Sequence, residues 1–189
     1  MTGFYVSVID HLLLIGMSYF MVDVEADGPV PGRYSMVSLA AVLVKPGLEE
    51  RFYAELRPIS DDFDPEALAV PGFSREQTLA FADPGPVMAD FEKWVLEHTK
   101  GRAFFISDNN GVDYMFVCWY LHQFVGRNPF DHSSQNLGSL YKGLVGDMFQ
   151  NFKHLRQTAY THNALDDALG NAEALLAIKE QYDLKIALE

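Results

Sequence analysis

One short stretch, residues 19–28, constrains the fold of this chain more than any other. An apolar run at residues 19–22 favours a buried β-strand, which then delivers Asp23 and Glu25 two positions apart. Residues two apart in a strand point to the same face, so both carboxylates share one small volume. Such close like charges are tolerated mainly when a cation lies between them or when one acid keeps its proton. We favour a metal ion, with a strand end running into a solvated acidic turn as the alternative.

The chain of 189 residues has the size of one domain, and its 49% hydrophobic content with 14 Phe supports a sizeable core. We divide it into an N-terminal extension, residues 1–17, and one domain, residues 18–189. The extension is either an over-long start or an added edge element. Its apolar part is shorter than the roughly 20 residues that span a bilayer and lacks a signal-peptide pattern, so we expect no membrane partner.

Charge and cysteine content restrict the class of protein further. The formal net charge of -12 argues against a protein that coats long nucleic acid, since that affinity comes from many Lys and Arg. It does not exclude a metal enzyme that acts on strand ends, where divalent cations would neutralise part of the acidity, and it is informative only together with the paired acids. The single cysteine, Cys118, lies in an apolar run and predicts a packed thiol in a reducing compartment. We therefore expect a cytoplasmic protein.

Three strands open the predicted sheet. Residues 35–44 are nearly free of charge, as expected for a strand covered on both faces, and residues 51–56 form a third strand paired with it as a meander. A later strand is predicted at residues 103–107. Residues 58–83 are expected to form an irregular loop with one helical turn near 65–69, and its acidic run is assigned no chemistry.

Three helices follow from caps and apolar periodicity. The first is capped by Asp83 and stops near Gly101, the second covers residues 112–125, and the third covers residues 163–182 with a small-residue stripe. Between the last two helices, residues 131–161 are predicted to be loop-rich. A short strand or turn is expected at 137–140 and a helical stretch at 146–155.

Further acids and one histidine stand at the starts of two of these helices. Asp113 lies in the first turn of the second helix, where the helix dipole also permits a purely structural role. Asp108 competes with it, and we expect Asp108 to cap the turn instead. His162 stands just before the last helix, with Asp167 five positions later. Alone, His162 would more often be a loop histidine and Asp167 an exposed helix acid.

Together these residues resemble the DEDDh branch of the DnaQ-like 3′→5′ exonucleases. The match consists of Asp23 and Glu25 after the first strand, Asp113 at a helix start, and His162 with Asp167 in a His-x-x-x-x-Asp pattern. It covers the chain from about residue 18 and is most similar to compact bacterial exoribonucleases. The resemblance implies an α/β, ribonuclease H-like fold with a mixed five-stranded sheet flanked by helices.

The resemblance also implies a reaction. The expected activity is hydrolysis of phosphodiester bonds at single-stranded RNA or DNA 3′ ends, with RNA favoured, releasing nucleoside 5′-monophosphates. Two divalent cations about 4 Å apart would assist it, and carboxylate ligation suits Mg²⁺ or Mn²⁺. On the family pattern Asp23 bridges both ions, Glu25 and Asp167 hold the first, Asp113 positions the second, and His162 is the general base. An imidazole, with its solution pKa near 6.5, can accept that proton at neutral pH.

Other function classes and other contacts stay open. A catalytically silent nucleic-acid- or protein-binding relative and a small-molecule phosphodiesterase are the alternatives, and a homodimer is compatible with the family. Substrate contacts are expected from the backbone amide of Ala26, from stacking side chains, and from a locally basic stretch whose alternative is ordinary surface charge. These contacts are Ala26, Tyr34, Met36, Tyr114, Lys142, Lys153 and Arg156.

Overall fold

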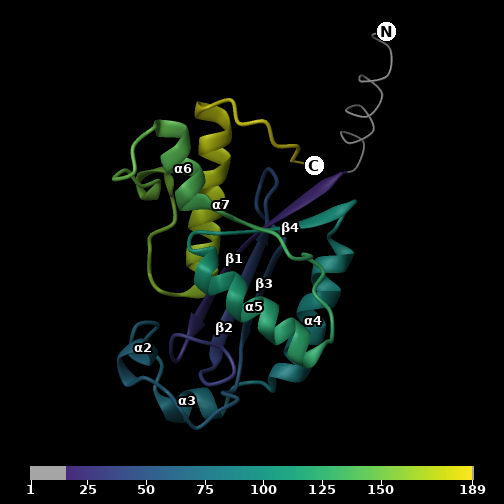
Figure 1. Ribbon diagram of the computed structural model, residues 1–189, viewed down its shortest axis with the longest axis vertical. Coiled ribbons are helices and arrows are strands. Elements are labelled where there is room, and N and C mark those ends of the chain that lie inside the picture. Colours follow the sequence, from purple (N-terminus) through teal and green to yellow (C-terminus); the bar gives the residue numbers. More distant parts are fainter. Residues whose placement is uncertain (1–15, 189) are drawn as a thin grey trace.

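A computed structural model describes residues 16–188, and its centre is a five-stranded sheet with the strand order β3-β2-β1-β4-β5 (Figure 1). The predicted extension, residues 1–17, lies almost entirely outside the described residues. The five strands are β1 (Met17–Ala26), β2 (Met36–Leu43), β3 (Arg51–Glu55), β4 (Arg102–Ser107) and β5 (Ser134–Asn136).

The pairing makes this a mixed sheet, as predicted. β1 and β2 are antiparallel, as are β2 and β3, which confirms the meander, whereas β4 runs parallel to β1 and β5 runs parallel to β4. Every residue of β2 is buried, which confirms a strand covered on both faces. β1 therefore lies at the centre of the sheet and is longer than its apolar run suggested, so that Asp23 and Glu25 lie within the strand.

Helices cover both faces of the sheet (Figure 1). α4 (Pro84–Glu97) and α5 (Asn110–Phe124) pack on one face, and α7 (Ala164–Gln181) packs on the other. Phe20 and Val22 of β1 belong to the core on the α4 and α5 side, whereas Met21 belongs to the core on the α7 side. Since side chains alternate along a strand, Asp23 and Glu25 lie on the α7 side.

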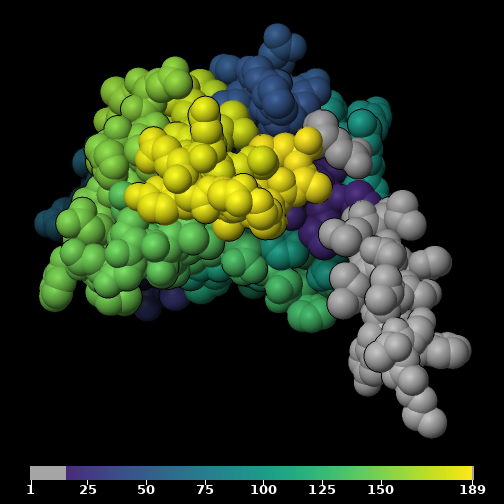
Figure 2. Space-filling model, turned by 90° about the horizontal axis from the view of Figure 1, so that it is seen from above, coloured from purple at the N-terminus to yellow at the C-terminus, as the bar shows by residue number. Residues whose placement is uncertain are grey.

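The predicted cap of α4 and the small-residue stripe of α7 are confirmed, although α4 ends at Glu97, before the predicted stop near Gly101. Asp83 caps α4, and Asn163 caps α7 by accepting hydrogen bonds from two backbone N–H groups of its first turn. Ala168 and Ala172 are fully buried, which lets α7 lie close against β1 and β2. Beyond α7, residues 182–188 lie on the face of the molecule that Figure 2 shows in yellow. Leu184, Ile186 and Leu188 of this segment pack against the core on the α7 side.

The segment between α5 and α7 corrects two predictions. Residues 137–140 form the first turn of a helix, α6 (Leu137–Val145), and not a strand or turn, because the Asn136 side chain caps it by accepting from the Ser139 N–H. Gly146 ends this helix in the left-handed conformation, with a φ of 68°. The helical stretch expected at 146–155 is therefore wrong, apart from the 3₁₀ turn η1 (Lys153–Leu155).

Two further helix boundaries depend on local capping. The helical turn α2 (Pro65–Ala69) is confirmed, but α3 (Arg75–Leu79) was missed although Ser74 and Gln77 form a reciprocal capping box. α5 begins directly after Asn109, slightly earlier than predicted, and Asp108 lies in the turn before it.

Among helices between residues 16 and 188, none has both the length and the apolarity to cross a membrane.

Candidate active site

The site lies at the carboxyl end of β1, where the strand meets the starts of α5 and α7. Asp23 pairs with Ala40 of β2 and Glu25 with Ser38, so both acids face small neighbours across the ladder. The register shifts between Glu25 and Ala26, because Ala26 pairs with Met36 and Val37 of β2 is skipped. The regular ladder of β1 thus ends at the second acid.

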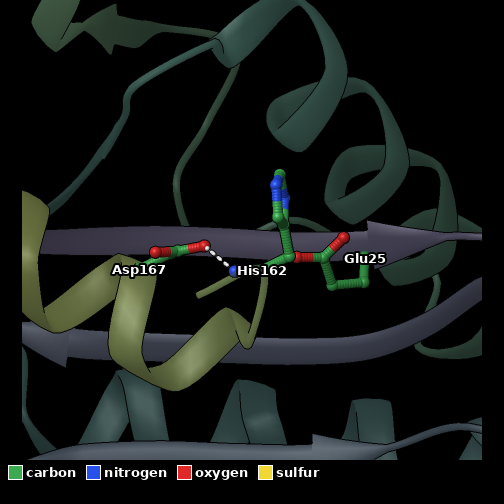
Figure 3. A group of neighbouring side chains, drawn as sticks. All are labelled: Glu25, His162 and Asp167. Carbon is green, nitrogen blue, oxygen red and sulfur yellow. Dashed lines mark hydrogen bonds between the residues drawn. The ribbon is translucent and has the colours of Figure 1, made fainter. Parts of the chain in front are cut away.

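His162 and Asp167 meet Glu25 at this strand end (Figure 3). One ligand atom from each of these three residues lies within 4.8 Å of the others, a spacing that could hold a metal ion. The backbone N–H of His162 donates to Asp167 Oδ2 at 3.0 Å, which fixes the loop before α7 to the first turns of that helix. The predicted His-x-x-x-x-Asp pair is therefore brought to the strand acids.

Asp113 reaches the same place from α5. Its side chain is buried, and Oδ1 accepts the N–H of Val24 at 3.4 Å. Val24 lies between Asp23 and Glu25, so this contact joins α5 directly to the acidic strand end. Burial raises the pKa of Asp113 to about 7, while hydrogen bonds such as the one from Val24 oppose the rise.

Burial, together with the crowding of carboxylates, raises the pKa values of the acids in the site. Burial, and then repulsion by Asp113, Glu25 and Asp167, raises the pKa of Asp23 well above its ordinary value. Burial, and then repulsion by Asp167 and Asp113, raises the pKa of Glu25 to about 8. The cluster therefore keeps protons near neutral pH unless a cation neutralises it. Oxygen donors of this kind suit a hard divalent cation.

The backbone and neighbours of His162 define where its imidazole lies. His162 has a φ of 58°, in the left-handed region that a non-glycine residue seldom adopts. Its ring packs edge-on against Tyr160 with a centroid separation of 4.5 Å. Burial, and then the nearby carboxylates led by Asp167, raises the pKa of Tyr160 to about 12. Sequence reasoning missed Tyr160, and its position two residues before His162 was the available signal.

Basic side chains border the acidic cluster. The Lys153 Nζ lies 4.4 Å from the centre of the Tyr160 ring. Lys153, Arg156 and Lys142 each lower the pKa of Asp108, although burial keeps that pKa raised overall. Asp108 was expected to be only a turn residue, yet it also repels Asp23. Lys153 therefore lies beside Tyr160, next to His162, whereas Lys142 acts on Asp108 only through its charge.

Arg156 differs from the two lysines. It was expected to contact a substrate phosphate, but its side chain is 3% exposed and Nη2 donates to Asp167 Oδ1 at 2.8 Å. The structure thus directs this guanidinium into the protein rather than toward solvent.

The predicted stacking side chains have different surroundings. Met36 is fully buried in the core and its N–H donates to the Tyr120 hydroxyl at 2.8 Å, so it offers no surface for a base and that expectation is corrected. Tyr114 packs against Phe105 and donates its hydroxyl to a backbone carbonyl. Tyr34 is partly exposed and covers Gly28, where a Cβ atom would lie 2.1 Å from the ring.

A mixed sheet of ribonuclease H-like order, with four acids and a histidine gathered at the end of its central strand, defines the DEDDh class of 3′→5′ exonucleases. The chain is 32% identical over 178 residues to the 3′-5′ DNA exonuclease Cap18 of Escherichia coli, covering 88% of this chain and 94% of that protein. The chain therefore belongs to the DEDDh 3′→5′ exonuclease family. No protein-family model matches the sequence.

Solved structures agree with this fold. Cell-death related nuclease 4 (CRN-4) superimposes with a TM-score of 0.71 at 14% identity, covering 88% of this chain and 65% of that one. The zinc-bound complex of Escherichia coli exonuclease I with single-stranded DNA has a TM-score of 0.68 at 15% identity, covering 89% of this chain and 41% of that one. The chain thus spans about two thirds or less of these proteins, and the likeness concerns the fold.

Proposed function

We propose that this protein is a divalent-metal-dependent 3′→5′ exonuclease that removes nucleoside 5′-monophosphates from single-stranded ends. The observation that carries the proposal is the convergence of Asp23, Glu25, Asp113 and Asp167, from three separate segments, beside His162. Asp113 and Asp167 are buried and Asp23 and Glu25 are half-buried, and such crowded carboxylates are unfavourable unless they keep protons or bind cations. Membership of the exonuclease family supports the same reaction.

The donor set fits two Mg²⁺ or Mn²⁺ ions. Glu25 and Asp167 would hold one ion, Asp113 would position the other, and Asp23 would be shared between them. When bound, divalent ions neutralise charge on the scissile phosphate and lower the pKa of water. The raised pKa values of Asp23, Glu25 and Asp113 support this fit, since a cation would replace the protons that these acids otherwise keep.

His162 would act as the general base. Its side chain is half-buried, lies beside Glu25 and Asp167, and comes from a loop whose backbone is fixed by the bond to Asp167. In this place the imidazole would accept the proton of the attacking water. The edge-on contact with Tyr160 would limit rotation of the ring, so that the accepting nitrogen stays directed at the reacting atoms.

The remaining contacts concern the substrate. Lys142 and Lys153 would contact phosphates, while the Ala26 amide, Tyr34 and Tyr114 would surround the terminal nucleotide. We propose DNA as the preferred polymer because the curated relative is a DNA exonuclease. RNA, which the sequence resemblance favoured, is the alternative that the assay separates. Dimerisation and a cytoplasmic location stay predictions.

A time course with 5′-labelled single-stranded DNA and RNA of matched sequence tests the proposal. With Mn²⁺ we expect a ladder that shortens from the 3′ end, is lost in Asp23→Ala and is slowed in His162→Ala by about 10²-fold or more. Asp90→Ala, an exposed acid on α4, is the matched control and should cleave normally. Binding of either polymer without cleavage by the wild type would favour a catalytically silent relative.

A further inference from the structure

Arg156 is enclosed between the loop that carries His162 and the first turns of α7. Its guanidinium donates to groups on both sides: the carbonyls of Thr158 and Ala159 in the loop, and the Asp166 carbonyl, the Asp167 carboxylate and the Asn171 side chain on α7. We propose that Arg156 is a positioning residue that holds Asp167 and the His162 loop in their working geometry, and that Gly170 provides the space it needs. This inference rests on the proposed exonuclease function.

The hydrogen bonds of Asp167 show what Arg156 fixes. Oδ1 accepts from Arg156 Nη2 at 2.8 Å and from the Thr161 N–H at 3.3 Å, while Oδ2 accepts from the His162 N–H at 3.0 Å. A carboxylate offers about four acceptor sites, so these bonds leave a site on Oδ2 for a further ligand. The carboxylate thereby keeps one orientation, with Glu25 and His162 close to it.

Gly170 makes room for this arrangement. A Cβ atom at position 170 would lie 2.3 Å from Arg156 Nε and 2.6 Å from Nη2, closer than any normal contact. Glycine inside a helix is less favourable than alanine by about 1 kcal/mol. Its place in the middle of α7 is explained by the guanidinium that lies directly against the helix there.

Arg156 is also connected to His162 through the ring of Tyr160. Its Cζ lies 5.1 Å from the centre of the Tyr160 ring, and that ring packs against His162 at 4.5 Å. Arg156 therefore touches one residue of the proposed acid cluster directly and reaches the proposed base through one aromatic ring. No substrate contact is needed for this role, and the 3% exposure of the side chain leaves little surface for one.

The test is a cycle of Arg156→Gln, Gly170→Ala and the double variant. Each single change should lower kcat by about 100-fold, since small displacements of reacting groups have effects of that size, with the KM for the oligonucleotide changed less than about threefold. In the Arg156→Gln background the methyl group added by Gly170→Ala meets a shorter side chain, so the second change should lower kcat less than about twofold further. Arg156→Lys keeps the charge but not the forked geometry and should not restore kcat.

Lys142→Gln is the contrasting control. Lys142 is a half-buried residue proposed to contact a phosphate, so its loss should raise KM and reduce the salt dependence of binding. Arg156 variants with that same signature, or kcat losses in Gly170→Ala and Arg156→Gln that simply multiply, would overturn the inference.

A second readout does not depend on activity. The backbone amide of His162, which donates to Asp167, should shift in the ¹⁵N–¹H spectrum of Gly170→Ala and of Arg156→Gln, while both proteins keep a cooperative thermal transition. If the wild type is inactive but this amide shifts, the proposed function fails and the contact stands. If the wild type is active and the amide does not move, the inference alone fails.

Discussion

The Asp113 carboxylate accepts the backbone N–H of Val24 at 3.4 Å, and this contact joins a helix acid to the residue between Asp23 and Glu25 of the central strand. The contact spans 89 positions of the chain, so it forms only when α5 packs on the sheet. Asp113 is therefore both a structural tie and a member of the acid cluster.

This double role predicts opposite effects of Asp113→Asn on stability and on activity. The amide oxygen can still accept the Val24 N–H, but one crowded carboxylate is removed, so the melting temperature at pH 8 without added cations should rise by a few degrees. Exonuclease activity should fall by about 10²-fold or more, because a metal position is lost. Thermal melts and rate measurements check this, with Asp61→Asn in an exposed loop as control. A lower melting temperature would contradict the crowding argument.

Stability without divalent cations should depend on pH through Glu25. Its pKa is raised from 4.5 to about 8 in the folded protein, so between these values the folded state holds a proton that the unfolded chain has released. The folded state binds more protons in this window, and the free energy of unfolding therefore decreases as pH rises through it. Melts in chelator should show a falling melting temperature from about pH 5 to pH 8.

Adding Mn²⁺ should oppose the fall of the melting temperature with rising pH. The cation replaces the protons, so it should raise the melting temperature more at pH 8 than at pH 5.5 and release protons on binding. Equal stabilisation at both pH values would contradict a carboxylate-bound cation.

A prediction about the core concerns the hydroxyl of Tyr120. This side chain is fully buried and accepts the N–H of Met36, so Tyr120→Phe leaves that backbone donor unpaired. We expect a loss of about 1–3 kcal/mol in the free energy of unfolding. Urea titration measures it, with Tyr34→Phe as a control on the partly exposed surface. No change would mean that water or another group satisfies the Met36 N–H.

A buried ion pair attaches the segment between β3 and α4 to the residue that follows β1. Asp27 is fully buried, and its carboxylate accepts from Arg75 Nη1 at 2.9 Å. Arg75→Gln removes the charge partner of a buried acid, and we expect a loss of about 3–5 kcal/mol. Arg33→Gln, at an exposed ion pair, should change stability by less than about 1 kcal/mol. Urea titrations of both variants compare the two, and similar effects would contradict the importance of burial.

Apolar runs and alternation predicted the strands, because strand formation depends on local pattern. The site acids were predicted from the resemblance to the DEDDh exonucleases, since local pattern alone left structural or exposed roles open for Asp113 and Asp167. Asn136 and Gly146, which begin and end α6, act through capping geometry, and the loop-rich composition around them concealed that helix.

The sequence could not distinguish an exposed basic residue from a buried one. Lys153 and Arg156 are three positions apart, yet Lys153 is exposed and lies over the Tyr160 ring, whereas Arg156 is enclosed against Gly170. Met36 was likewise expected to contact the substrate. Its burial beside Tyr120 could not be predicted, because Tyr120 belongs to a helix far along the chain. These differences arise from long-range contacts, which no local pattern encodes.

The central claim, that the acid cluster and His162 form a hydrolytic site for nucleic-acid ends, is tested most directly by identifying the product. Wild type and Asp23→Asn should be incubated with single-stranded DNA and Mn²⁺, and the small products analysed by mass spectrometry. We predict nucleoside 5′-monophosphates that appear from the 3′ end, disappear with chelator and are absent for Asp23→Asn. Nucleoside 3′-phosphates, or equal release by Asp23→Asn, would contradict this account of the site.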